Sequence, residues 1–423
     1  MSFRFVHAAH LHLDAPMRGI ADAPASIRVA LRDASLVAWE RLVRSAIEHE
    51  AAFLLIAGGL FDSDGATARA HAAFAEGVRK LYAAGISTFV CLGEEDTSQG
   101  LLGLAPAGLS GLAPAATVFQ VGRVSAVPVV RDGAVLATIH GVSSTSDGPE
   151  VSPATCFRVR GQGLQVALAA VPVERDAILD PAIDYWAVGR SHEQARHREQ
   201  PWVVSSGTLQ GRAPESSESG PKGAMVIEAD DQHVRRVSFL ELDRVRFLLL
   251  RVDVSGLPDP SAVRTEVLRQ LDAEGAADDG RLLVVDATLH GEDSTGGAPT
   301  PWKRAAGLLD ELRCDAEERG HPVWWNRVND RRTRARNDPR PRTGKLGNVV
   351  SERAQALAAA TLPRSSFLAR RFDPLRQVWN AEIDLSSATE LVREAASLAV
   401  DVLGSEAVDE NSRLVNSEKR SVT

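Results

Sequence analysis

Cysteine and long apolar runs are both scarce in this sequence of 423 residues. Cys91, Cys156 and Cys314 are far apart and odd in number, which fits a reducing compartment without disulfides. No apolar run reaches membrane-spanning length and no signal-peptide pattern is present, so we expect a cytoplasmic protein without membrane contact. The net charge of -8 argues against a protein coated in nucleic acid, although a local basic groove is compatible with it.

What is present predicts a globular protein of several domains. Hydrophobic residues make up 44% of the chain and charged residues 25%, and the length predicts two or three domains. Apolar strands are predicted at 3–9, 53–57 and 88–92, separated by amphipathic helices at 35–50 and 66–84. This β-α-β-α-β order is typical of a doubly wound α/β fold.

After residue 100 the pattern changes from alternating strands and helices to strands alone. The predicted strands are 118–121, 124–130, 135–142, 164–171, the apolar part of 183–192, and those within 203–212 and 224–228. A second, smaller α/β unit is predicted from strands at 247–254 and 282–289 and helices at 261–274 and 303–319. We therefore expect a first domain over 1–240 and an α/β domain over 243–345 that ends in an Arg-rich segment. A helical region over 346–404 and a disordered tail over 405–423 follow.

Two histidines follow the first predicted strand. On an extended strand end, residues two apart point the same way, so His10 and His12 could converge on one point. Strand ends are where α/β folds place their chemistry, and this pair suggests a metal site whose other ligands come from elsewhere. His7, within the strand, is predicted to be a core histidine.

The order of the strand ends resembles that of the calcineurin-like metallophosphoesterase superfamily. His-x-His closes the first strand, Gly-Gly-x-x-Asp the second, Gly-Glu-Glu-Asp the third and Gly-Arg-x-His a late one. Phrases at 3–9, 11–16, 53–58, 60–62, 184–189 and 210–212 are similar to the SbcD-type (YhaO-like) DNA repair exonuclease branch. The resemblance covers 1–228 and continues more weakly from 245. It implies a four-layer α/β/β/α sandwich with a smaller C-terminal α/β capping domain and a helical tail.

The resemblance also implies that most ligands of the family's two metal ions are replaced. The substituted positions are His10, Gly59, Glu94, Glu95, Ala170 and Arg190, and the retained ones are His12, Asp62, Asp96 and His192. Glycine at 59 offers no donor atom to bridge two ions, so we do not expect the family's two-metal manganese centre. Arg190 is expected to take the place of the second ion beside Glu94 and to contact phosphate in a cleft with Asp62 and Asp96.

The first metal position leaves two alternatives open. His10, His12 and His192 would surround one ion, and three histidines with an open fourth position suit zinc. In the other interpretation these residues are remnants and the cleft binds no metal. The expected cofactor is therefore none, or one divalent ion of zinc or manganese.

The resemblance further implies work on DNA with a partner. We expect an SbcD-like subunit, inactive or strongly impaired as a nuclease, that binds DNA ends and forms a homodimer. Its partner would be an SbcC-like coiled-coil ATPase docked on the C-terminal helices, which could instead pack on their own domain. The alternative is a phosphodiesterase or exonuclease with a single-metal, three-histidine site. Trp324 and Trp325, followed by arginines, either clamp DNA or begin a solvated linker. The DNA-binding candidates are Arg331, Arg332, Arg334 and Arg336.

Overall fold

The computed structural model divides the chain into two compact units. The first comprises Met1–Glu292 and Pro301–Arg332, and the second comprises Asp293–Thr300 and Thr333–Thr423. The residues described are 2–20, 22–62, 67–96, 112, 114–145, 157, 161–170, 180–274, 280–293, 301–319 and 322–334. The predicted helical region 346–404, the predicted tail 405–423 and Arg336 lie outside them, and the predicted domain boundaries stay predictions.

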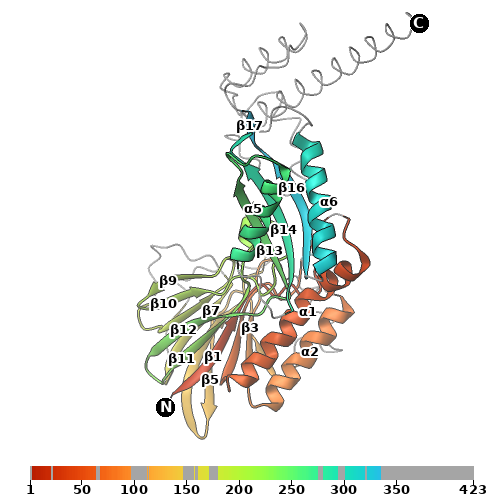
Figure 1. The fold of residues 1–423 in the computed structure, drawn as a ribbon. Coiled ribbons are helices and arrows are strands. Elements are labelled where there is room, and N and C mark those ends of the chain that lie inside the picture. The colour runs from red at the N-terminus through yellow and green to blue at the C-terminus, as the bar shows by residue number, and fades with distance from the viewer. Residues whose placement is uncertain are drawn as a thin grey trace, which may run out of the picture. The chain divides into compact units, whose positions relative to one another are not determined.

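A six-stranded sheet holds the N-terminal strand at its centre (Figure 1). Its order is β12 (Val234–Glu241), β11 (Gly223–Ala229), β1 (Phe3–Ala8), β2 (Phe53–Ala57), β3 (Ser87–Cys91) and β4 (Ala116–Val118). The four strands from β1 to β4 run parallel, whereas β11 and β12 are antiparallel additions. The predicted β-α-β-α-β opening is confirmed, so the loops after β1, β2 and β3 meet at one edge of this sheet.

A second six-stranded sheet packs against the first. Its order is β5 (Ser125–Arg131), β6 (Ala134–Val142), β7 (Leu164–Ala169), β8 (Tyr185–Val188), β10 (Trp202–Ser205) and β9 (Ala195–Glu199). The strands from β6 through β7 and β8 to β10 are parallel, so the loop after β8 emerges at a carboxyl edge as well. The predicted hairpin turn joins β5 to β6, with Asp132 and Gly133 both at positive φ.

The layers follow from where the apolar side chains lie. Helices α1 (Ala25–Glu48) and α2 (Ala68–Ala83) cover one face of the first sheet, where Trp39 and Phe74 pack on Ile56. Between the sheets lies a core rich in aromatic rings, such as Phe53 and Tyr185. Residues on the outer face of the second sheet, among them Trp186 and Val203, are also buried. The predicted α/β sandwich is confirmed.

A three-stranded parallel sheet with two helices forms the smaller α/β part. It contains β13 (Val245–Asp253), β14 (Leu282–His290) and β16 (Val323–Asp330), with α5 (Pro260–Ala273) and α6 (Pro301–Arg319). The sheet's other face receives Leu31 and Ala34 from the first half of α1. This burial explains why α1 begins at residue 25 and not at the predicted 35. A two-stranded sheet joins β15 (Glu292–Asp293) to β17 (Thr333–Arg334).

The tryptophan pair is part of this small sheet, so both alternatives for it, stacking on nucleic acid and the start of a solvated linker, are wrong. Trp324 and Trp325 lie within β16 and are 7% and 1% exposed. The guanidinium of Arg313 lies 4.2 Å from the ring centre of Trp324. Because packing and this cation-π contact already cover the rings, no base can reach them.

The expected DNA-binding arginines differ in their surroundings. Arg332 donates to both carboxylate oxygens of Asp330, at 2.8 and 2.7 Å, and its side chain is only 7% exposed. Arg332 therefore belongs to a structural ion pair with Asp330, and the prediction that Arg332 contacts DNA is wrong. Arg331 is exposed, and Arg334 is described only through the backbone of β17.

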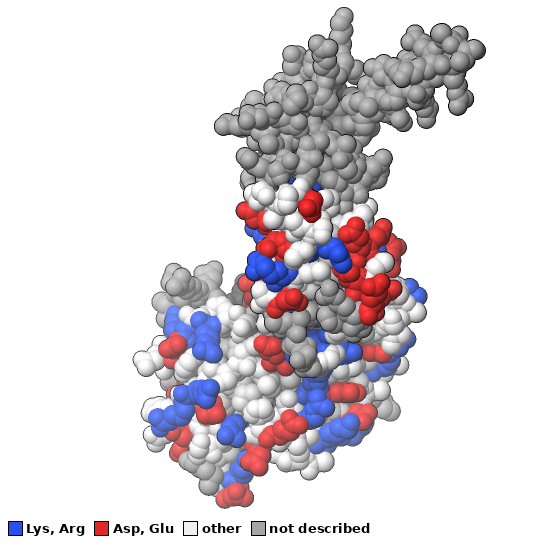
Figure 2. All heavy atoms as spheres, in the orientation of Figure 1, with Lys and Arg blue, Asp and Glu red and all other residues white. Residues whose placement is uncertain are grey.

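On the face in Figure 2, blue and red side chains are interspersed over the lower part of the described residues, and a group of red ones gathers at the right of the upper part. No continuous basic track crosses the described residues on this face. No described helix combines the length and apolarity needed to cross a membrane.

Candidate metal centre

The loop after β1 presents two histidines on one side. His10 and His12 have φ angles of 47° and 41°, and both backbone N–H groups donate to carbonyls of the loop after β2 at 2.9 Å. Leu11 and Leu13, which alternate with these histidines along the chain, are buried in the core under the helices. The two imidazoles therefore point to the opposite side, into the cleft. Their convergence was predicted, but left-handed backbone produces it, and the expected extended strand end is wrong.

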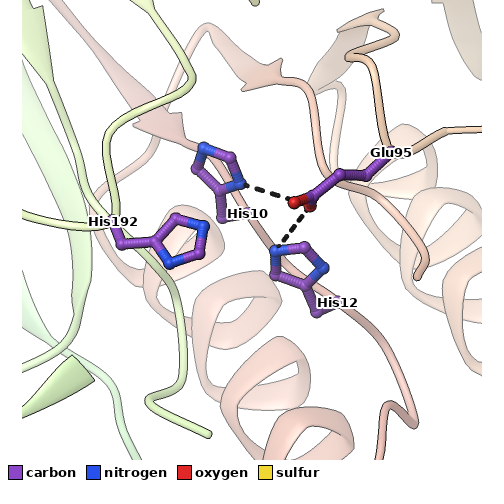
Figure 3. Close-up of side chains that lie close together, drawn as sticks. All are labelled: His10, His12, Glu95 and His192. Atoms are coloured by element: carbon purple, nitrogen blue, oxygen red, sulfur yellow. Dashed lines mark ion pairs between the residues drawn. The ribbon is translucent and has the colours of Figure 1, made fainter. Parts of the chain in front are cut away.

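Two further strand ends complete a cluster of possible metal ligands (Figure 3). His192 follows β8 and Glu95 follows β3, and one donor atom from each of His10, His12, Glu95 and His192 lies within 4.8 Å of the others. The Oε2 atom of Glu95 is 3.2 Å from Nε2 of His12 and 4.0 Å from Nδ1 of His10. The structure thus brings the three predicted histidines together and adds Glu95, which the family resemblance marks only as a substituted position.

Burial keeps these imidazoles neutral. Burial, followed by the charges of His192 and Arg212, lowers the pKa of His10 to about 3. Burial, followed by the charge of Arg212, also lowers the pKa of His12 well below its usual value. Neither ring nitrogen of His10 or His12 has a hydrogen-bond partner, and Oε2 of Glu95 has none. Unpartnered buried polar atoms are costly, and a divalent ion would satisfy one ring nitrogen of each histidine and the Glu95 oxygen. A set of three imidazoles and one carboxylate fits zinc.

At the position expected for a second ion, the possible donor Glu94 is paired with Arg190. Gly59 and Ala170 line a cavity of about 250 Å³ together with Glu94 and Arg190. Arg190 pairs with Glu94 through Nη1, as expected, and both side chains are 48% exposed. At Gly59, where φ is 64°, an added Cβ would lie 2.7 Å from Nδ1 and 2.8 Å from Cα of His10. This side of the cleft therefore offers one guanidinium in place of a metal site.

Asp96 does not face the cleft, so its expected contact with phosphate is wrong. The residue is 1% exposed, and its carboxylate accepts four backbone N–H groups. The donors are Gly59 and Gly93 at 2.9 and 2.8 Å on Oδ2, and Leu60 and Phe61 at 2.8 and 3.1 Å on Oδ1. Burial raises the pKa of Asp96 to about 6 although these bonds lower it. Asp96 joins the loops after β2 and β3 into one cleft floor.

Asp62 is likewise engaged by the protein. Its Oδ2 lies 3.3 Å from Nη1 of Arg212 and 3.6 Å from Nη2 of Arg18. A carboxylate between two guanidiniums does not contact phosphate itself. Arg212, 9% exposed, brings a buried positive charge next to His10 and His12. It belongs to the Gln-Gly-Arg phrase at 210–212, which carried the family resemblance without a role for this residue.

Glu218 is a functional candidate that sequence reasoning missed. Its Oε1 atom lies 2.7 Å from Nδ1 of His192, and its side chain is 6% exposed. Burial alone would raise the pKa of Glu218, but the hydrogen bond from His192 and the charges of His192 and Arg212 hold it below its usual value. The stretch 213–223 is polar and rich in glycine, as surface loops are, and no local pattern distinguishes Glu218 within it.

Comparisons with known proteins match parts of this chain. Residues 247–333 match the family model described as metallophosphoesterase YhaO, middle domain. The uncharacterized metallophosphoesterase YhaO of Bacillus subtilis (strain 168) is 26% identical over 243 residues, which cover 53% of this chain and 56% of that protein. These findings support the calcineurin-like metallophosphoesterase family. The matched stretch spans about half the length of that metallophosphoesterase.

Two solved structures resemble this metallophosphoesterase-like chain at a distance. A protein of Thermus thermophilus is 14% identical with a TM-score of 0.32, covering 54% of this chain and 99% of its own. A dimetal phosphatase from Danio rerio is 11% identical with a TM-score of 0.36, covering 58% of this chain and 97% of its own. Metallophosphoesterases use metal ions, and the His/Glu cluster is where this chain can hold one.

Proposed function

We propose that this chain is a DNA-processing subunit that holds one divalent ion and binds DNA ends in its metallophosphoesterase cleft. The observation that carries the proposal is the cluster of His10, His12, Glu95 and His192. All of these except His12 line the same cavity as Arg190. These residues would hold a divalent ion, and such an ion would supply a Lewis acid for a phosphate oxygen. Arg190 provides a second positive group for another oxygen of the same phosphate. Zinc suits the donor set, and manganese is the alternative.

Cleavage is expected to be strongly impaired. Two-metal phosphoesterases stabilise the attacking and the leaving oxygen with separate ions. Gly59 and Ala170 have no donor atom for a second ion, and Glu94 is bonded to Arg190. A guanidinium neutralises charge on a phosphate, but it does not activate water as a metal ion does. The main role of the cleft is therefore binding, with the chain as a scaffold.

The experiment compares a blunt DNA hairpin with a closed dumbbell of the same sequence by fluorescence anisotropy. The hairpin should bind more tightly, and chelation of the metal should abolish that preference. Arg190→Ala should weaken end binding roughly tenfold, the size of one lost charge-assisted bond. The control is Arg79→Ala, which removes an exposed arginine of α2. Equal affinity for hairpin and dumbbell, or equal effects of the two substitutions, would contradict the proposal.

The proposed partner is an SbcC-like coiled-coil ATPase that binds the region 346–404, within a complex that contains two copies of this chain. The resemblance of 1–228 to the SbcD-type branch supports this assignment. Co-expression with a coiled-coil ATPase encoded by a neighbouring gene should yield a stable complex on size-exclusion chromatography. Removal of 346–423 should abolish it. Independent elution of the two full-length proteins would refute the partnership.

A second candidate function is hydrolysis of phosphodiesters at the single-metal site. Glu95 favours it, because its side chain is 42% exposed and could withdraw to open a fourth coordination position. The test is release of nucleotides from duplex ends, and of product from a generic phosphodiester, with added zinc or manganese. Turnover that His12→Ala abolishes would establish the enzyme and overturn the scaffold role. Turnover that survives this substitution would come from a contaminant.

A further inference from the structure

Glu218 is a buried carboxylate that contacts one of the candidate metal ligands. It ends the 3-10 helix η3 (Ser216–Glu218) in the loop between β10 and β11, and the residue is 5% exposed. Its Oε1 lies 2.7 Å from Nδ1 of His192. Its Oε2 accepts the backbone N–H of Arg212 at 3.1 Å. Both oxygens therefore have partners, and one partner is the ring of His192.

The loop holds this carboxylate in place independently of the histidine ring. The backbone N–H of Glu218 donates to the carbonyl of Glu215 at 3.1 Å. Lys222, 5% exposed, donates from Nζ to the carbonyl of Ser217 and, at 3.2 Å, to that of His192. The same lysine thus links the loop of Glu218 to the strand end that carries His192.

His192 is the ligand that needs such support. Its side chain is 27% exposed, whereas those of His10 and His12 are 8% and 1% exposed and are held by packing. An imidazole that donates from Nδ1 to a carboxylate keeps its lone pair on Nε2. The ring centre of His192 lies 4.7 Å from that of His10 and 5.9 Å from that of His12, and Figure 3 shows the three rings facing one space.

We infer that Glu218 is a positioning residue that fixes the tautomer and orientation of His192 at the metal centre. This inference rests on the proposed function only in requiring that a divalent ion binds there. Glu218 itself is not a ligand, because its two oxygens are taken by His192 and Arg212. Carboxylates in this position also make the ligand imidazole more basic, and their loss typically weakens metal binding about 10- to 100-fold.

The experiment measures zinc affinity of the full chain by competition with a chromophoric chelator. Glu218→Ala should weaken zinc binding about 10- to 100-fold, and Glu218→Gln, which keeps an acceptor without the charge, should weaken it less. Glu215→Gln, an exposed carboxylate of the same loop, is the matched control and should bind zinc as the wild type does. Nitrogen-15 NMR of labelled histidine, with His192→Ala for assignment, reports the tautomer directly.

The outcomes separate this inference from the proposed function. If the wild-type chain binds no divalent ion, the proposed metal centre fails and the inference with it. If the wild type binds zinc and Glu218→Gln leaves both affinity and tautomer unchanged, only the inference is overturned. Should Glu218→Ala fail to fold, Glu218→Gln and the NMR signal of His192 still decide. A mixed tautomer of His192 in Glu218→Gln, together with weaker zinc binding, would support the role of Glu218.

Discussion

Replacing Asp96 removes the acceptor that holds two loops of the cleft together. Its carboxylate receives the N–H groups of Gly59, Leu60, Phe61 and Gly93. In Asp96→Ala all four donors lose their partner. In Asp96→Asn the retained oxygen can still accept from Leu60 and Phe61, while the new amide group faces two other N–H donors. The alanine variant therefore loses about twice as many bonds as the asparagine variant.

The loss in the free energy of unfolding follows from the number of hydrogen bonds that each variant lacks. An orphaned buried donor costs about 1–3 kcal/mol. Gly59 and Gly93 line the cavity, where water can replace part of the loss, so the lower limit applies. Asp96→Ala should then lower the free energy of unfolding by about 4 kcal/mol and Asp96→Asn by about 2 kcal/mol. At roughly 2–4 °C per kcal/mol, the melting temperature should fall by about 8–16 °C and about 4–8 °C.

The assay is thermal unfolding followed by circular dichroism. A pH of about 7.5 keeps the carboxylate ionised, because burial raises the pKa of Asp96 only to about 6. Asp272→Ala, at an exposed position of α5, is the control and should leave the melting temperature unchanged. Equal shifts for the two Asp96 variants, or a shift below about 2 °C for alanine, would refute the role of Asp96 in joining the loops.

Three further predictions concern pH, metal and the arginine segment. Burial lowers the pKa of His7 from 6.5 to about 3, so its stabilising contribution is complete above 6.5 and is lost as pH falls toward 3. Between about pH 7 and pH 5, His7 should cause about 2 kcal/mol of the fall in the free energy of unfolding, and His7→Asn should lack this part of the fall in urea unfolding with EDTA. Parallel pH profiles of stability for the two proteins would contradict this. Zinc at about 100-fold its dissociation constant should raise stability by about 2.7 kcal/mol in calorimetry, and an equal gain in His12→Ala would rule out this site. Because Arg332 is a buried partner of Asp330, Arg332→Ala should cost about 3 kcal/mol of stability without changing DNA affinity. A weaker DNA complex from a variant of normal stability would reverse that assignment.

Much of the sandwich could be predicted because its strands are local patterns. The run that became β2 is apolar over its whole length, and those that became β1 and β3 are mostly apolar, as strands covered on both faces are. The three histidines could be located because they follow such strands, whose ends meet at one edge. The early start of α1 could not be predicted, since its first turns become apolar contacts only when the small sheet packs on Leu31 and Ala34.

The site residues that were misjudged depend on contacts between distant segments. Glu218 lies in a stretch without periodicity, and its role appears only when the loop meets His192. Asp96 was expected in the cleft by position, but four N–H groups from two loops take its oxygens. Trp325 was considered as part of a DNA clamp or of a linker because arginines follow it, whereas β16 pairs with β14 and the ring is buried. In each case at least one deciding partner is distant in the sequence, and the spacing of residues along the chain does not reveal such partners.

The contact between Gly59 and His10 restricts how this cleft can change. Any residue with a Cβ at position 59 would meet both the ring and the backbone of His10, at less than 3.0 Å in each case. A single substitution that introduces an acid at 59 would therefore displace a candidate ligand before it could add one. A smaller residue at 10 would relieve the contact with the ring but not the one with Cα, because Cα belongs to the backbone. A design that aims at a second ion must therefore also move the backbone of this loop.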